Sequence, residues 1–343
     1  MRRRIAGIYG LLAIINVGAW IWAVIAFRAQ PLLLSTGLLA YGFGLRHAVD
    51  ADHIAAIDNV TRKLMQAGRR PVSIGFFFAI GHSTVVLLAT AAVAATAATL
   101  QGRFEAWKGL GGVISTSVSA SFLFLVAAMN IVILRGIWQT FRRVRQGGDY
   151  ADDALDPMLN RSGPLTRLFQ PAFRLVSASW HMFPLGFLFG LGFDTATEVS
   201  LLGVSAAEAA KGISTWSIMV FPALFAAGMS LVDTTDGVLM LGAYEWAFVR
   251  PVRKLYYNLT ITLVSILVAL LIGGIEALGL IEGRLGLTGP LWNFIGRLNG
   301  NFGTLGFAII GVFVVSWAVS ALVYRIKGYD RLDHARLDPA SLD

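Results

Sequence analysis

The chain has no cysteine among its 343 residues, and only 14% of its residues are charged. The lack of cysteine excludes disulfides, iron–sulfur clusters and thiolate metal sites, so a bound transition metal must take nitrogen and oxygen ligands, with methionine sulfur as a weak addition. The scarcity of charge excludes an ordinary water-soluble protein, in which about 25% of residues are charged. The sequence also has no P-loop, so ATP is not expected to drive its activity.

Apolar residues make up 56% of the chain and gather in segments of 22 to 29 residues. At 1.5 Å per residue, each segment is long enough to cross a hydrocarbon core of roughly 30 Å. We therefore predict an all-α, polytopic membrane protein with eight transmembrane helices in a lipid bilayer. The predicted spans are residues 5–27, 31–58, 72–98, 110–134, 180–204, 214–242, 255–278 and 303–324.

Polar intervals divide these spans into two groups of four. Residues 1–135 hold the first four predicted helices and residues 179–326 the last four, with a cytoplasmic loop at 136–178 and a cytoplasmic tail at 327–343. The segment 287–301 is too short to span and is expected at the membrane interface.

The orientation follows from the lysine and arginine count. With the N-terminus inside, 21 of these residues lie on the cytoplasmic side and 6 outside, while Arg46 lies within a span. This split fits the positive-inside rule with both termini cytoplasmic, in the cytoplasmic (inner) membrane of a prokaryote. The net charge of +8 is thereby explained without a nucleic-acid partner.

Ionisable side chains occur inside four of the predicted spans, where they are costly and by default mark ion pathways or proton relays. His47, His82, Asp194 and Asp233 all fall roughly 13–21 Å from the inner membrane face, counted along their helices. Four helices that present such groups at one depth predict one shared site. The candidate metal ligands are His47, Asp50, Asp52, His53, His82, Asp194, Glu198, Asp233 and Asp236.

Some charged residues have simpler interpretations. Arg46 is expected to be a structural cation for Asp50 or Asp52, and Asp58 with Arg62 is expected to form an interfacial pair. His181, at the start of the fifth span, is either interfacial or part of an inner route.

The second span raises a geometric problem. His47 and His53 are six residues apart, so on a regular helix they point about 120° away from each other. Either the helix is distorted between them, or one histidine supports the site without binding the ion. We favour distortion.

A short internal match joins two other spans. DTATEVSLLG from Asp194 and DTTDGVLMLG from Asp233 share the pattern D-T-x-x-x-V-x-x-L-G on helices of opposite direction. Transporters built of internal repeats place opened helices in this way.

Several function classes can use a buried His/Asp cluster. Imidazole and carboxylate ligands suit the transport of nickel, cobalt, zinc or iron. A membrane oxygenase would need more histidines than the five present, and the H-E-x-x-H helix of a metalloprotease is absent, so an enzyme is not expected. A proton-relay pump or channel that uses the same cluster stays open as the alternative.

The motifs resemble those of the nickel/cobalt transporter (NiCoT) family of secondary metal permeases. The family hallmark H-x4-D-H matches His47, Asp52 and His53, and the further blocks GHSTVV, LGFDTATE, GMSLVDTTDG and LNGNFGTLGF follow in order. The resemblance implies high-affinity uptake of Ni²⁺ or Co²⁺ without a cofactor or an ATPase subunit. It also implies that the three hallmark residues are essential.

The same resemblance bears on metal preference. Asn16 in the first span and Val49 inside the hallmark resemble the nickel-preferring members, so nickel is expected over cobalt. We further expect Ni²⁺ to be held near the midplane by His47 and His53, with Asp50 or Asp52 supplying negative charge. The membrane potential would drive uptake.

Overall fold

The computed structural model describes residues 1–96, 101–145, 176–191, 196–247 and 251–326, and all regular structure within these ranges is helical. Inside a bilayer the backbone has no water to bond with, so each spanning segment must satisfy its own hydrogen bonds. The long apolar segments of this chain do so as helices. The helices are α1 (Arg2–Ala26), α2 (Leu32–His47), α3 (Ala51–Gln66), α4 (Ile74–Thr96), α5 (Gln101–Arg145), η2 (Ser179–His181), α8 (Met182–Phe189), α9 (Ala196–Ala210), α10 (Thr215–Ile218), α11 (Val220–Ala247), α12 (Pro251–Leu285), α13 (Pro290–Asn299) and α14 (Phe302–Ile326).

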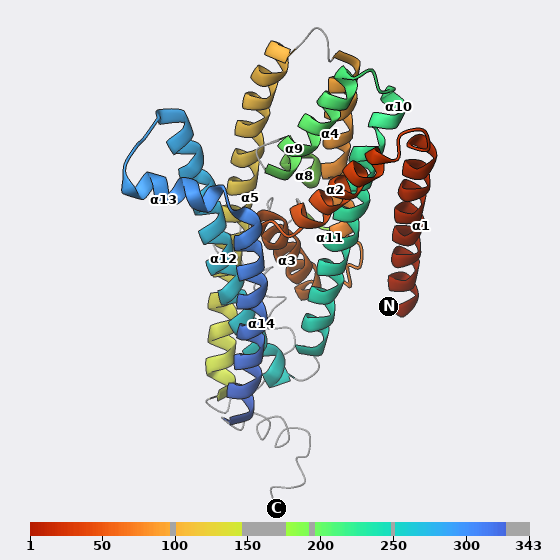
Figure 1. Ribbon diagram of the computed structural model, residues 1–343. Helices are drawn as coiled ribbons and strands as arrows, with labels where there is room; N and C mark the ends of the chain where they lie inside the picture. Colours follow the sequence, from red (N-terminus) through yellow and green to blue (C-terminus); the bar gives the residue numbers. More distant parts are fainter. Residues whose placement is uncertain (97–100, 146–175, 192–195, 248–250, 327–343) are drawn as a thin grey trace, which may run out of the picture.

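Helix α11 lies in the middle of the bundle and packs against α1, α2, α3 and α4 (Figure 1). On one flank α12 packs against α5 and α14, while α1 forms the opposite flank. The start of α1 and the end of α14 both point to the lower side of Figure 1, and α13 lies in the upper half.

Six helical segments are long and apolar enough to cross a membrane, and a seventh span results if α2 and α3 count as one bent span. The predicted count of eight spans is therefore not confirmed. The predicted span at 180–204 is divided: α8 ends at Phe189 with Gly190 as its C-cap, and α9 begins only at Ala196. Residues 192–195, with the predicted ligand Asp194, lie outside the described residues.

The second predicted span is broken at its polar cluster. Helix α2 ends at His47, α3 begins at Ala51, and the two are bent by 51°. Asp50 adopts an extended conformation at the N-cap of α3. The predicted distortion between His47 and His53 is confirmed, whereas the predicted end at residue 58 is wrong, because α3 continues to Gln66.

Helix α3 is rich in polar residues yet buried on nearly all sides, with 13 of its 16 residues buried. Asp58 and Arg62 are both 0% exposed, so the predicted interfacial pair is wrong. Asp58 accepts hydrogen bonds from Tyr244 and Ser265, and Arg62 donates to Asn59 and Thr262. Asn130 also donates to Asn59, at 2.8 Å. Residues of α5, α11, α12 and α3 itself thus supply hydrogen-bond partners to Asp58, Asn59 and Arg62, as burial of polar groups requires, although the buried Nε of Arg62 has no partner among the described residues.

Helix α13 has only 10 residues and exposes Leu291 and Phe294. At 1.5 Å per residue this helix is too short to cross a hydrocarbon core. The prediction that the segment does not span is confirmed.

Candidate metal site

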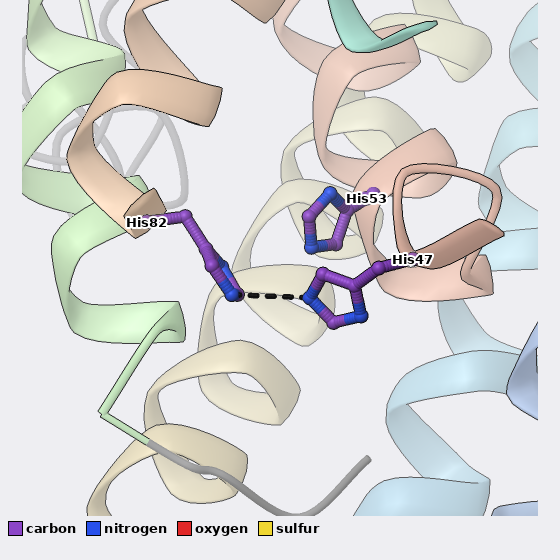
Figure 2. Close-up of side chains that lie close together, drawn as sticks. All are labelled: His47, His53 and His82. Atoms are coloured by element: carbon purple, nitrogen blue, oxygen red, sulfur yellow. Dashed lines mark hydrogen bonds between the residues drawn. The ribbon is translucent and has the colours of Figure 1, made fainter. Parts of the chain in front are cut away.

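Three histidines meet at the break between α2 and α3 (Figure 2). His47 ends α2, His53 lies in the first turn of α3, and His82 reaches them from α4. One ligand nitrogen from each ring can be chosen so that all three lie within 4.8 Å of one another. The side chains are 2%, 0% and 3% exposed, so they form an enclosed nitrogen cluster that could hold a metal ion.

Two of the rings already place their nitrogens at the spacing of ligands on one ion. The Nε2 atoms of His47 and His82 are 3.0 Å apart, and the dashed line in Figure 2 joins them. Two nitrogens at about 2.1 Å from one metal, separated by about a right angle, would lie about 3 Å apart. Small rotations of the rings would thus replace the contact between the nitrogens with bonds to a metal.

His53 is oriented by a carboxylate on α11. Its Nδ1 lies 3.3 Å from both carboxylate oxygens of Asp233, a residue that is itself 0% exposed. Its Nε2 is buried and has no hydrogen-bond partner within the described residues. A histidine whose first nitrogen donates to a carboxylate presents a lone pair on the second, which is the usual arrangement of a metal-binding histidine.

His47 is oriented in a similar way from the other side. Its Nδ1 lies 2.9 Å from Asp50 Oδ2 and 3.3 Å from the hydroxyl oxygen of Thr197. These contacts direct the Nε2 atom toward His82 and identify Asp50 as a partner of a ligand. Sequence reasoning did not single out Thr197, although its place beside Glu198 in DTATE was a usable signal.

An oxygen donor completes the cluster. Glu198 Oε1 lies 2.8 Å from His82 Nε2 and 3.8 Å from His47 Nε2, and Glu198 is 2% exposed. Three imidazole nitrogens with one carboxylate oxygen form a ligand set that suits nickel, cobalt or zinc.

Of the nine predicted ligands, the structure brings six together and leaves two, Asp52 and Asp236, apart, while the ninth lies outside the described residues. Together lie His47, Asp50, His53, His82, Glu198 and Asp233. Asp52 instead lines a neighbouring cavity together with Arg46 and Asp50, and Arg46 has no carboxylate within 4.0 Å in the described part of the chain. Arg46 therefore forms no direct ion pair with Asp50 or Asp52 in the described residues, and its role as a structural cation for them stays a prediction.

Asp236 and His181 also lie apart from the cluster. Asp236 is almost one turn beyond Asp233 on α11, and its buried Oδ2 has no hydrogen-bond partner among the described residues. His181 lies in η2, where its Nδ1 accepts a hydrogen bond from the backbone N–H of Ser177. Asp194 is outside the described residues.

The two residues that the resemblance associates with metal preference lie on α1 and in the α2–α3 break. Asn16 on α1 accepts a hydrogen bond from the Tyr41 hydroxyl of α2 and donates to the carbonyl of Ala227 on α11. Val49 lies in the α2–α3 break, and a Cβ atom at Gly306 of α14 would stand 1.5 Å from its carbonyl oxygen. Only glycine at 306 allows α14 to approach the break so closely.

The sequence of this chain is similar to those of known proteins. A family described as high-affinity nickel-transport protein matches residues 33–323. The high-affinity nickel transport protein of Cupriavidus necator is 58% identical over 96% of this chain and 94% of its own length. The high-affinity nickel-transport protein of Helicobacter pylori strain 26695 is 39% identical over 92% of this chain and 96% of its own length.

A relative named for another metal is also similar. The cobalt transport protein of Rhodococcus rhodochrous is 40% identical over 95% of this chain and 94% of its own length. No solved structure matches the chain. The matched family and these relatives are metal transporters and not enzymes, in agreement with the prediction. The chain belongs to the family of high-affinity nickel-transport proteins.

Proposed function

We propose that this protein is a secondary transporter for the uptake of Ni²⁺, and that His47, His53, His82 and Glu198 bind the ion. The observation that carries the proposal is the convergence of three buried imidazoles within 4.8 Å in a member of a nickel-transporter family. Asp50, Thr197 and Asp233 orient the ligands and supply negative charge near the divalent ion.

A preference for nickel over cobalt is part of the proposal. Its support is the resemblance at Asn16 and Val49 and the higher identity to the nickel protein of Cupriavidus necator than to the cobalt protein of Rhodococcus rhodochrous. Asn16 ties α1 to α2 and α11, and Val49 lies directly after the ligand-bearing end of α2. Both can change the spacing of the ligands without touching the ion.

The membrane potential is the proposed driving force. A divalent ion that enters a cell at about −100 mV gains roughly 4.6 kcal/mol, equivalent to about 2000-fold accumulation. No ATPase subunit is then required. The excess of lysine and arginine on one side supports cytoplasmic termini in the inner membrane of a prokaryote, with the α13 half of the bundle outside.

The test is uptake of radiolabelled Ni²⁺ into proteoliposomes with an imposed potential, with Co²⁺ as the competitor. His53→Ala should abolish uptake, because it removes a buried ligand that no neighbour can replace. His181→Ala is the matched control, since His181 lies outside the cluster, and its uptake should be that of the wild type. Wild-type uptake by His53→Ala would refute the site.

The His47–Asp50 and His53–Asp233 contacts also favour a second candidate, a proton relay. Its signature in the same proteoliposomes is proton flux without any metal-dependent uptake. A pH-sensitive dye trapped inside the vesicles would measure that flux.

A further inference from the structure

A cavity of about 430 Å³ lies beside the histidine cluster, on the side of α13. Its wall combines the α2–α3 break with α5, α9, α12 and the turn between α13 and α14. The lining residues used below are Arg46, Asp50, Asp52, Thr197, Ser200 and Glu276.

The charges of this cavity match those of a divalent cation. Three carboxylates, from Asp50, Asp52 and Glu276, face one guanidinium, from Arg46, and leave a formal excess of two negative charges. Glu276 is only 5% exposed, and its Oε1 accepts a hydrogen bond from the neutral hydroxyl of Ser119 at 2.8 Å.

The cavity adjoins the metal site at two side chains. Asp50 and Thr197 line the cavity, and both also contact His47 Nδ1. The three histidines are at most 3% exposed, so an ion in the cavity would still be separated from their nitrogens. The cavity is therefore a separate compartment on the way to the ligands.

The size of the cavity suits an ion that still carries its water. Six water molecules occupy about 180 Å³ at about 30 Å³ each. A hexahydrated ion thus fits in the cavity with room to move, whereas the enclosed histidine cluster has room only for a dehydrated ion.

We propose that this cavity is a loading site, in which Glu276 and Asp52 hold the hydrated divalent cation through its water shell before it passes to the histidines. Glu276 sets the apparent affinity of uptake. The cationic Arg46 in the same wall weakens the binding enough for the ion to move on, as conduction requires. This inference rests on the proposed function.

The first test is Glu276→Gln, which keeps an oxygen acceptor for Ser119 and removes the charge. A divalent ion about 6 Å from a carboxylate in a water-filled space gains about 1.4 kcal/mol, so KM for Ni²⁺ should rise about tenfold. The kcat should change less than twofold, and the dependence of KM on salt concentration should weaken. Glu282→Gln is the matched control, because Glu282 lies on the same helix but not in the cavity wall.

A second pair of variants places charge in the cavity without changing Glu276. Ser200 is exposed and lines the cavity. Ser200→Lys should raise KM severalfold and Ser200→Asp should lower it, with kcat little changed. This ordered series does not depend on whether Glu276→Gln folds.

The outcomes separate the two proposals. If the wild type takes up nickel but Glu276→Gln leaves KM unchanged, the loading site is overturned and the transport function stands. The same holds if the Ser200 variants do not change KM in the expected order. No nickel uptake by the wild type would overturn the proposed function. A fall in kcat alone would assign Glu276 a structural role and also overturn the loading site.

Discussion

The two sides of the histidine cluster differ in how space is filled. On the side of α13, a cavity of about 430 Å³ reaches the partners of His47. On the other side, α3 is buried over 13 of its 16 residues, and Arg62 and Asp58 bond to residues of α11, α12 and α3 itself. Arg62 lies nine residues beyond His53, roughly 13 Å along the helix.

This contrast teaches how the cluster can be reached. The start of α3 borders the cavity, whereas the rest of the helix is enclosed by packed side chains. A transporter must open each side in turn around one site. The described arrangement has a cavity on the side of α13, and passage of an ion to the other side would require the contacts of Asp58 and Arg62 to rearrange.

The largest expected effect is on stability and comes from a substitution on the closed side of the cluster, where Asp58 and Arg62 are buried. Arg62→Met should lower the free energy of unfolding by about 3–5 kcal/mol, because it leaves the Asp58 carboxylate buried without the cation one turn away. Arg46→Met is the matched control: Arg46 is exposed and has no carboxylate within 4.0 Å in the described residues, so its loss should change stability by less than about 0.5 kcal/mol. Thermal unfolding in detergent measures both, and equal losses would contradict the contrast.

The next largest effect on stability comes from a side chain added where α14 packs against the α2–α3 break. A Cβ atom at 306 would meet the Val49 carbonyl oxygen at 1.5 Å, so Gly306→Ala should destabilise by about 1–3 kcal/mol and distort the cavity wall. At Gly311, on the same helix, an added Cβ meets nothing within 4 Å. Gly311→Ala should therefore stabilise slightly, by about 0.5–1 kcal/mol. The same sign for both variants in a thermal-unfolding assay would show that the close approach is unimportant.

A smaller effect concerns the residue that orients His53. Asp233→Asn should weaken Ni²⁺ binding about 10- to 100-fold, because the carboxylate fixes the ring and raises its basicity. Titration of the purified protein with Ni²⁺ measures this change. Asp236→Asn serves as the control, since Asp236 has no contact with the histidines among the described hydrogen bonds, and it should change binding less. If Asp236→Asn weakened Ni²⁺ binding more than Asp233→Asn, the binding site would have to lie nearer to Asp236 on α11.

The smallest expected effect is on KM and comes from removing the positive charge of Arg46 from the cavity. Arg46→Gln should lower KM for Ni²⁺ uptake about threefold, since the cavity loses its repulsive charge. Uptake at low and high salt measures this, and the difference should shrink at high salt because mobile ions screen the cavity. A higher KM would mean that Arg46 helps to hold the ion.

Sequence reasoning located most of the site for a definite reason. Ionisable groups are rare within apolar helices, so equal depth alone connected His47, His82 and Asp233, and the 100° step of a helix required a break between His47 and His53. The structure places Asp52, which was expected with the histidines, in the cavity wall. The direction of a side chain after a break depends on the bend, here 51°, and no spacing rule supplies that angle.

The same limit explains the error at Asp58 and Arg62. Their position near the end of a predicted span suggested an interface, but α3 extends to Gln66 and is enclosed by α5, α11 and α12. Burial of a polar helix depends on partners far away in the chain, such as Asn130, Tyr244 and Thr262. Local composition cannot reveal those partners.

The sequence alone determined the all-helical membrane class, the absence of thiolate ligands, the polar depth shared by four segments and the family motifs, because composition and helical periodicity act locally. Only the tertiary structure decided which nitrogen of each histidine is oriented toward its neighbours, that Glu198 joins them and Asp52 does not, and that the cluster has an open side and a closed side. These features depend on distances between helices, which packing sets through contacts such as that of Gly306 with Val49.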